Sequence, residues 1–569
     1  MKKTGLSLFL TILLLFSCGV SAAFAQTAEQ IEKGQLDINK ELQLRKELEK
    51  PRKPVKVEDE VKAPQQPKLP EAKTYIGKIE VTGVTLVPQE EIEGVIKGYE
   101  NQELAVSTMQ QLADRITEVY RKKGFVTSRA YLPPQKIENK LLEIRVIEGI
   151  TGDITVKGNR YFKSELISRK IALKKGQAFN YENLRRGLSR INQLPDRNAK
   201  AVLLPGKEPG TTDIILEVSD RLPLHVGFDW DNYGSRYIDS QRFRLTVTDN
   251  NLLGFDDVLT FQAQTAQASA YDLFALRYVF PITQDLKVGF FAARSKIELQ
   301  KEYKGSDTRG KYKYFSLYFT QSIIDRENVS LAADFGFDYK DLFNFASGLE
   351  TSRDRLRNLR LGFDFNATDN YGRTLFTEEF TYGLARIMGG LDPRDPDSSV
   401  SGAGGKFLKN NLNLVRLQKM PFNSLLLWKN QAQLSPYILT AAEQFQIGGI
   451  ANVRGYPPAE VVGDTGASMT WEWSFPVYFI PKKTKVPFSQ STFYDAFRVV
   501  GFYDWAWSYL HRPSAGVKKS TTLRAAGAGI RFNLKEDLSL RYDIAWPLDG
   551  RIPSDGKRAH QWMEFSKSF

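Results

Sequence analysis

Hydrophobic and polar residues alternate along short segments of the chain from residue 222 onward. In residues 468–477, one face carries Met469, Trp471, Trp473, Phe475 and Val477, and the other carries Ser468, Thr470, Glu472 and Ser474. A period of two residues is typical of β-strands with two different faces. Because the hydrophobic face is strongly aromatic, the pattern favours strands that face lipid over the alternative, a large soluble β-sandwich.

Sixteen segments of this kind follow one another, separated by turns. We place them at 223–232, 241–249, 257–267, 271–280, 286–298, 309–322, 328–340, 355–367, 373–385, 407–417, 423–434, 468–477, 496–508, 520–533, 538–546 and 561–569. An even number of antiparallel strands brings both ends of a barrel to the same side of the membrane. The sequence therefore predicts a 16-stranded antiparallel transmembrane β-barrel over residues 222–569, in contact with outer-membrane lipid and lipopolysaccharide.

The lengths of the connections give this predicted barrel a direction. Connections after odd-numbered strands are mostly long, and those after even-numbered strands are mostly short. Long loops are typical of the outer side and short turns of the periplasmic side. Residues 268–270 and 478–495 depart from this rule. The aromatic residue Phe569 at the end of the last strand is usual for an outer-membrane barrel.

The region before the barrel contains an internal repeat. The sequence IEVTG at 79–83 returns as ITVKG at 154–158, about 75 residues later. Each copy continues with two helical stretches and ends in a strand, at 141–149 and at 213–220. This order predicts two tandem α+β domains, each with an exposed sheet edge. The domains could be a rigid spacer, or they could capture a peptide by strand addition at that edge, and both interpretations stay open.

We place the two α+β domains at 74–149 and 150–221. The first contains a well-specified long helix, for which Ser107 and Gln110 predict an N-terminal capping box and Gly124 predicts the end. The spacing predicts that its buried face carries Met109, Leu112, Ala113, Ile116, Val119 and Tyr120.

The N-terminus predicts export from the cytoplasm. Two lysines, an apolar stretch and an Ala-x-Ala site are typical of a secretory signal peptide, which we place at residues 1–25. A lipoprotein signal ending at Cys18 is the alternative. Residues 26–50 have helix-forming composition but are too polar for an apolar core, which suits a helix in a water-filled lumen. Residues 51–73 are rich in proline and charge and predict an extended linker.

Composition and charge narrow the class of protein. The mean hydropathy is −0.36, yet Phe, Trp and Tyr make up 12% of the chain, as two-faced strands would produce. Beyond the signal peptide, no apolar run is long enough for a spanning helix. The formal net charge of +13 fits phosphate-bearing lipid surfaces or acidic partners. Because the chain is exported, we expect no nucleic-acid partner.

Candidate chemistry is sparse. The three histidines, His225, His511 and His560, lie far apart without metal-ligand spacing. Residues 401–406 look like a phosphate loop, but Phe407 follows the lysine where Ser or Thr would hold magnesium. We find no pattern of a nucleophile and a base. We therefore expect no metal, no cofactor and no enzyme activity.

One segment stands out among the predicted outside loops. Residues 447–460, IGGIANVRGYPPAE, belong to the sixth loop, which we place at 435–467. In the predicted strand 496–508, alternation directs Phe502 and Asp504 into the lumen. The centre of the loop segment is Val453, Arg454, Gly455 and Tyr456. We therefore expect this loop to fold inward and to bring an arginine to a lumen carboxylate.

The residue types at the loop centre fit that arrangement. The planar guanidinium of Arg454 can form two parallel hydrogen bonds to Asp504. Gly455 permits a sharp backbone and close contact with the wall, and Tyr456 supplies a rigid ring. The alternative is a solvated loop in which the arginine is incidental, because Arg-Gly-Tyr alone is a weak signal.

The sequence resembles a known family at these residues. The run from Val453 to Tyr456 resembles the (V/I)-R-G-(Y/F) signature in the sixth loop of the outer-membrane assembly and transport superfamily, and Phe502-x-Asp504 is similar to its F-x-D motif. Where that motif has glycine two residues later, this chain has Ala506, which leaves the packing there open. The tandem domains resemble POTRA domains. The order of parts resembles the TpsB transporters of two-partner secretion, typified by the filamentous haemagglutinin transporter.

The resemblance implies an export function. A TpsB transporter binds an unfolded exoprotein, such as an adhesin, haemolysin or toxin, at periplasmic POTRA domains and passes it through the outer-membrane barrel without nucleotide hydrolysis. It also implies that the helix expected at 26–50 can occupy the pore. A factor that inserts other barrels into the membrane is the chief alternative. Two repeats and a polar N-terminal helix favour secretion, and a passive porin would not need tandem periplasmic domains.

Overall fold

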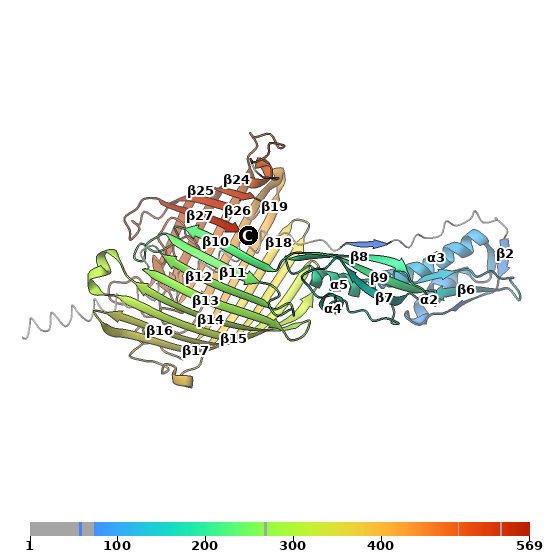
Figure 1. Cartoon of the computed structure of the whole chain (residues 1–569), viewed down its shortest axis with the longest axis horizontal. Helices are drawn as coiled ribbons and strands as arrows, with labels where there is room; N and C mark the ends of the chain where they lie inside the picture. The colour runs from blue at the N-terminus through green and yellow to red at the C-terminus, as the bar shows by residue number, and fades with distance from the viewer. Residues whose placement is uncertain (1–55, 60–72, 267–269, 488, 535–537) are drawn as a thin grey trace, which may run out of the picture. The chain divides into compact units, whose positions relative to one another are not determined.

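The computed structural model describes residues 56–59, 73–266, 270–487, 489–534 and 538–569. These residues belong to two compact units, one within Arg52–Pro223 and the other within Leu224–Phe569. Figure 1 shows the helices and small sheets of the first unit and the large barrel of the second. The signal peptide and the helix expected at 26–50 lie outside the described residues, as does most of the linker expected at 51–73.

The first repeat folds into two small sheets packed with helices. Its elements are β2 (Lys73–Ile76), β3 (Lys78–Thr82), α2 (Gln89–Ile96), β4 (Gln102–Ala105), α3 (Val106–Lys122), β5 (Arg129–Tyr131) and β6 (Leu141–Ile147). One sheet has the strand order β3-β6-β5, and β2 pairs with β4. Leu112, Ile116 and Tyr120 of α3 are completely buried against Leu142 and Ile144 of β6. The predicted helical face is therefore the one that forms this core.

The start of α3 differs from the prediction. The capping box expected at Ser107 and Gln110 is wrong, because the N-cap residue is Ala105 and its side chain makes no capping hydrogen bond. Strand β4 runs directly into the helix, so Ser107 already lies in the first helical turn. The predicted end is confirmed: the helix ends at Lys122, and Gly124 has a φ of 87°.

The second repeat comprises β7 (Ile150–Lys157), α4 (Ser164–Ser168), α5 (Tyr181–Ile191), β8 (Arg197–Pro205) and β9 (Thr211–Asp220). Its sheet has the order β1-β8-β9-β7, in which β1 (Val57–Asp59) comes from the linker before the first repeat. The core packs Leu184 and Leu188 of α5 against the sheet. Among the described residues, no helix has the length and apolar character needed to cross a membrane.

The glycine that ends the repeated sequence motif has the same structural role in both copies. Gly83 and Gly158 end the two motifs with φ values of 84° and 86°, a left-handed backbone that favours glycine. A Cβ atom would lie 2.4 Å from the carbonyl oxygen of Val146 at the first glycine and 2.5 Å from that of Val218 at the second. Both glycines therefore let the chain pass close to the neighbouring central strand.

The second unit is a closed barrel in which each strand pairs with its neighbours in sequence order and β10 pairs with β27 (Figure 1). The strands are β10 (Leu224–Asp231), β11 (Arg242–Asp249), β12 (Val258–Ala266), β13 (Tyr271–Pro281), β14 (Leu286–Glu298), β15 (Arg309–Asp325), β16 (Val329–Ala346), β17 (Leu349–Asp369), β18 (Gly372–Gly383), β19 (Leu408–Met420), β20 (Ser424–Leu434), β23 (Thr465–Pro476), β24 (Phe497–Tyr509), β25 (Ser520–Leu534), β26 (Leu538–Pro547) and β27 (His560–Ser568). The 16-stranded antiparallel barrel predicted from the alternation is confirmed.

Side chains alternate between the two sides of the barrel wall as the pattern predicts. On β23, Trp471 and Trp473 are 51% and 45% exposed on the outer face, whereas Glu472 between them is 6% exposed. On β24, Phe502 and Asp504 are buried on the lumen side. The aromatic outer face suits contact with lipid.

Two connections differ from the prediction. The expected long connection between the seventh and eighth strands is a tight hairpin, because β16 continues to Ala346 and β17 begins at Leu349. Ser347 and Gly348 between them both have positive φ, 51° and 79°, as in the hairpin turns that match strand twist. Strand β23 also begins at Thr465, three residues earlier than expected, so the sixth loop occupies residues 435–464.

Candidate functional site

The sixth loop contains a small fold of its own. Its base is a two-stranded sheet of β21 (Phe445–Ile447) and β22 (Val461–Gly463). Beyond the base, Gly448 and Gly449 turn the chain with φ values of 113° and 82°. The Asn452 side chain accepts hydrogen bonds from the N–H groups of Gly448 at 2.7 Å and Val453 at 2.9 Å. The loop therefore contains a turn that is held by hydrogen bonds within the loop itself.

The tip places Arg454 against Asp504 of β24. The guanidinium donates two hydrogen bonds, from Nε to Oδ2 at 2.8 Å and from Nη2 to Oδ1 at 2.9 Å. The backbone N–H of Arg454 also donates to Oδ2 at 3.1 Å. Arg454 is 1% exposed and Asp504 is 0% exposed. The structure thus shows the two-bond contact expected from the lumen-facing register of β24.

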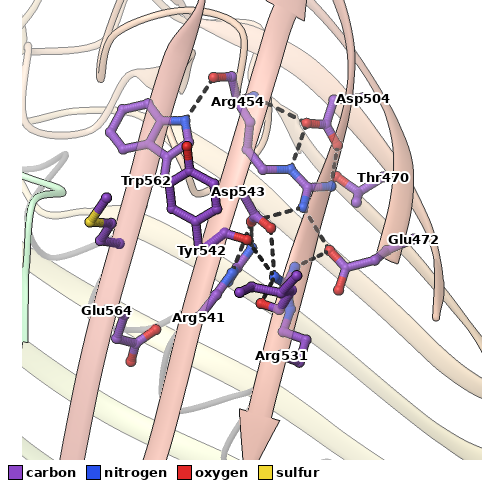
Figure 2. Close-up of polar contacts among 12 residues, drawn as sticks. Arg454, Thr470, Glu472, Asp504, Arg531, Arg541, Tyr542, Asp543, Trp562 and Glu564 are labelled. Carbon is purple, nitrogen blue, oxygen red and sulfur yellow. Dashed lines mark hydrogen bonds and ion pairs between the residues drawn. The ribbon is translucent and has the colours of Figure 1, made fainter. Parts of the chain in front are cut away.

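Arg454 also contacts two carboxylates that the sequence analysis did not assign to it. Its Nη1 atom lies 2.6 Å from Oε2 of Glu472 on β23 and 3.3 Å from Oδ2 of Asp543 on β26 (Figure 2). These two carboxylates are bridged in turn by Arg531 of β25, at 2.9 Å and 2.5 Å, and Asp543 binds Arg541 at 2.6 Å. We refer to Arg454, Glu472, Asp504, Arg531, Arg541 and Asp543 as the charge cluster.

The charge cluster is balanced and mostly shielded from water. It pairs three guanidinium groups with three carboxylates, and each of these side chains is at most 11% exposed. A buried charge is costly without a partner, and removing one member of such a set typically costs about 3–5 kcal/mol. Loss of one member would therefore leave unbalanced buried charge beside the loop tip.

Neighbouring strands hold the same tip through other groups. The Phe502 ring lies under the guanidinium, with its centroid 3.3 Å from Cζ of Arg454, which favours a cation–π contact. The Trp562 indole N–H of β27 donates to the Arg454 carbonyl at 2.8 Å, and Lys429 of β20 donates to the Ala451 carbonyl at 2.5 Å. Five consecutive wall strands from β23 to β27, together with β20, thus line the tip.

Gly455 and Tyr456 fit closely against the wall. A Cβ atom on Gly455 would lie 2.9 Å from the backbone nitrogen of Pro547 and 3.0 Å from the carbonyl carbon of Trp546. The predicted close wall contact is therefore present, but Gly455 has no positive φ, and the sharp backbone is supplied by Gly448 and Gly449.

An apolar cluster surrounds the tip beside these glycines. It contains completely buried Val453, Tyr456 and Ala506, together with Ile447, Leu523 and Ala525. The methyl group of Ala506, where the related motif has glycine, is accommodated in this cluster. The question that the sequence left open about packing at this position is thereby answered.

A second anchor lies nearer the start of the loop. Glu443 is 1% exposed and bonds Lys340 of β16 at 2.8 Å and also Lys409 of β19. Burial raises the pKa of a carboxyl group, but the two ammonium groups outweigh it and hold the pKa of Glu443 below its usual range. Because the loop contacts β16 here and β26 at its tip, strands eight positions apart in a ring of sixteen, it crosses the lumen.

Sequence reasoning missed several of these residues. The pattern places Glu472 on the polar face of its segment, so alternation alone is a signal that it faces the lumen. Glu443 opens the segment before the loop motif, yet its partner Lys340 is 103 residues away, and only the barrel register brings them together. The partners of Arg454 at Glu472 and Asp543 are likewise 18 and 89 residues distant.

Three family profiles match the chain in the order of its parts. Residues 75–149 match the ShlB-type POTRA domain. Residues 150–198 match a POTRA profile described as a surface antigen variable number repeat. Residues 210–517, more than half of the 569 residues, match the haemolysin secretion/activation protein family ShlB/FhaC/HecB. The chain belongs to this family.

Relatives of known name agree with this membership. The heme/hemopexin transporter protein HuxB of Haemophilus influenzae (strain 86-028NP) is 23% identical over 499 residues, 85% of each chain. The structure of CdiB from Escherichia coli aligns with a TM-score of 0.73 at 19% identity, covering 96% of this chain and 98% of that one. BamA from Haemophilus ducreyi, solved without POTRA domains 1–3, aligns with a TM-score of 0.52 at 15% identity, covering 87% and 100%. The two structural matches show a shared fold.

Family membership confirms the class of function inferred from the sequence. The chain is an outer-membrane transporter of two-partner secretion, with POTRA domains on the periplasmic side of its barrel. The alternative, a factor that inserts other barrels, is the weaker interpretation, because the profile covering more than half of the chain is one of secretion and activation proteins.

Proposed function

We propose that the two POTRA domains bind one unfolded exoprotein and that the exoprotein then moves through the barrel beside the anchored sixth loop. Family membership supports the first part of this proposal. The observation that supports the second part, the position of the loop in the export path, is the burial of Arg454 among three carboxylates. A loop that only covered the barrel mouth would gain nothing from placing a guanidinium 1% exposed against the wall. We infer that Val453, Arg454, Gly455, Tyr456, Phe502 and Asp504 together set the position of the loop in the export path.

The two anchors suggest how the loop affects the path. Glu443 contacts β16 and β19, and Arg454 contacts β23, β24 and β26. A segment that is fixed to opposite sides of the barrel wall divides the lumen. An extended chain would then pass on one side of this segment. Release of either anchor would let the loop move into that space. On this proposal the anchors keep a passage of fixed width.

The exoprotein belongs to the class of adhesins, haemolysins and toxins in this proposal. We infer that its chain enters unfolded, because the sixth loop crosses the lumen and leaves only part of it for passage. The periplasm lacks ATP, so we infer that folding of the exoprotein outside the cell supplies the direction of movement. The outward-facing Trp471 and Trp473 suit contact with lipid and lipopolysaccharide.

Co-expression with a candidate exoprotein from a neighbouring reading frame tests the proposal. We expect the exoprotein in the medium or on the cell surface only when the chain is present. The control is a chain without residues 74–221, which keeps the barrel but lacks both POTRA domains. Exoprotein that stays in the periplasm, together with loss of other barrels from the outer membrane when the chain is absent, would favour the assembly factor instead.

We also propose that residues 26–50 occupy the pore at rest, as the resemblance to TpsB transporters implies. Single-channel recording in planar bilayers tests this role. Removal of residues 27–50 should raise the conductance, because a helix in the lumen excludes water and ions. Equal conductance with and without these residues would rule against the plug.

A further inference from the structure

The edge of the second POTRA sheet is occupied by a piece of the chain's own linker. Strand β1 pairs in parallel with β8, with Val57 opposite Ala201, Glu58 opposite Val202 and Asp59 opposite Leu203. The N–H group of Ala201 donates to the Lys56 carbonyl at 3.1 Å. Without β1, this part of β8 would present unpaired backbone groups to water, which is the usual site of strand addition.

The neighbouring part of the same edge is closed in a different way. The Asn192 side chain, 8% exposed, donates to the Ala199 carbonyl at 3.1 Å and accepts from the Ala199 N–H at 2.7 Å. One amide thereby satisfies both groups that a partner strand would bind there. Strand addition to β8 is therefore limited to the stretch that β1 covers.

The contacts of β1 are few and exposed. Val57 packs against the core of the second repeat. Glu58 lies 3.1 Å from Lys200, which also lies 2.9 Å from Glu217, and the side chains of this trio are 36–52% exposed. Exposed ion pairs contribute little to stability. A strand of only three residues held in this way can exchange with a competitor.

The surface beside β1 shows what a competitor must carry. The open face of the sheet forms a groove lined by Lys56, Lys157, Lys200 and Glu217, among others. Lys56 belongs to the linker and would leave with it, but Lys157 and Lys200 remain on the sheet. Because Lys200 already pairs with Glu58 at 3.1 Å, an acidic side chain fits the outward position. The inward position occupied by Val57 favours an apolar side chain. An extended segment that alternates apolar and acidic residues therefore fits this edge best.

We propose that residues 201–203 of β8 accept an extended exoprotein segment of this alternating kind, and that residues 56–59 of the linker occupy the site until the exoprotein displaces them. This proposal rests on the proposed function of the POTRA domains. It adds a specific strand, a side-chain pattern and a competitor within the chain itself. Because the linker precedes the first POTRA domain, displacement would also free the segment that joins residues 26–50 to that domain.

Engineered disulfides in the full chain test the competition. The only cysteine, Cys18, lies in the expected signal peptide. The pair Glu58→Cys and Val202→Cys would fix β1 on the edge, since these residues are opposite each other. The matched control is Asn198→Cys with Ser219→Cys, an opposed pair on β8 and β9 of the same sheet that leaves the edge unchanged. Secretion of the co-expressed exoprotein is measured with and without a reducing agent.

We expect the locked variant to secrete at least tenfold less exoprotein until it is reduced, while the control secretes equally in both states. Equal secretion by the oxidised and reduced locked variant would overturn the inference and leave the proposed function intact. Absence of secretion by the wild-type chain and by every reduced variant would overturn the proposed function, and with it this inference.

A second measurement examines the freed edge. A photoreactive amino acid at Asn198, beside the acceptor stretch, captures whatever lies along β8. Val57→Asp removes the apolar contact of the linker with the core of the second repeat, so capture of the exoprotein should rise several-fold over the wild-type chain. In the oxidised locked variant, capture should be lost. Equal capture in all three chains would show that the exoprotein does not use this edge.

Discussion

Two segments of this protein lie on sheets formed by other parts of the chain, and they are held in opposite ways. The tip of the sixth loop rests on the barrel wall through a charge cluster whose members are at most 11% exposed. The linker strand β1 rests on the β8 edge through one packed valine, backbone bonds and an exposed ion pair. On our proposals, this difference in burial separates a fixed attachment from an exchangeable one.

The comparison also separates two tasks of a secretion channel. Recognition in the periplasm needs a surface that can be vacated, whereas the export path needs a fixed wall. Of the four variants below, three change the sixth loop and its anchors, and we expect strong effects on stability or secretion. The fourth changes the linker strand, and we expect a weak effect on stability. The variants run from the largest expected effect to the smallest.

The largest effect is expected for Arg454→Ala, which leaves the buried Asp504 without its guanidinium partner, while Glu472 and Asp543 keep only Arg531 and Arg541. Removal of one partner from a buried set costs about 3–5 kcal/mol. Secretion should fall by more than tenfold, while the barrel still reaches the outer membrane in heat-modifiable form. The matched control is Arg386→Ala. Arg386 forms an ion pair with Asp392, and the two side chains are 74% and 52% exposed. Wild-type secretion by Arg454→Ala would contradict the role of the cluster.

The next effect is expected for Glu443→Gln, which leaves Lys340 and Lys409 close together without their carboxylate. Loss of hydrogen bonds to charged groups costs about 1.5–3 kcal/mol. The barrel should unfold at a lower temperature, and adding Lys409→Met should recover part of the loss by removing one buried charge. No recovery in the double variant would show that Lys409 is not coupled to Glu443.

The same anchor has a defined dependence on pH. Because the folded pKa of Glu443 is lowered, its contribution to stability is complete above the pKa of the unfolded carboxyl group, about 4.3. The contribution is lost only as the pH falls below that value towards the folded pKa. Between pH 5 and 8, the difference in unfolding temperature between wild type and Glu443→Gln should therefore stay constant.

A smaller effect is expected for Gly455→Ala. The added methyl group would meet the backbone between Trp546 and Pro547 of β26, which cannot move as a side chain can. Overpacking of this kind costs about 1–3 kcal/mol. Protease accessibility of the sixth loop in intact cells measures the displaced tip, with Gly501→Ala on β24 as the control because nothing lies within 4 Å of a Cβ atom there. Equal cleavage of both variants would contradict the close wall contact.

The smallest effect is expected for Glu58→Gln, which breaks the exposed contact with Lys200. The thermal unfolding midpoint should stay unchanged, because the ion pair is open to water. Capture of the exoprotein at the β8 edge should nevertheless rise, since the linker competes less well. A marked loss of thermal stability would mean that β1 is a structural strand, and the contrast with the sixth loop would fail.

The barrel could be predicted because its strands repeat one signal. Lipid on one side and the lumen on the other impose a period of two on every strand, so each segment could be recognised separately. Residues 341–354 are the exception: the pattern predicts a loop there, but most of them belong to β16 and β17, which are joined by a turn at Ser347 and Gly348. At the start of this stretch, Asp341 shares a face with Phe343 and Phe345, whereas Leu342 lies on the buried face. The hydrophobic alternation is therefore broken at the point where the predicted strand ends.

The candidate site could be predicted only in part. Alternation placed Asp504 in the lumen, and the inward loop brought Arg454 to it. Glu472 and Asp543 could not be assigned, because their proximity depends on the relative register of four strands. The capping box of α3 failed for a local reason. The sequence pattern of Ser107 and Gln110 is satisfied, but β4 runs directly into the helix, which therefore begins two residues too early for this cap.

The hairpin of β16 and β17 has a consequence for the cell surface. Its strands contain 18 and 21 residues, whereas about 9–11 suffice to traverse a bilayer. The additional residues extend the hairpin beyond the bilayer on the side of the outside loops, and the turn at Ser347 and Gly348 forms the crest of this extension. Antibodies and bacteriophages approaching the bacterium would meet this crest early, so it is a natural place for an epitope tag that reports display on living cells.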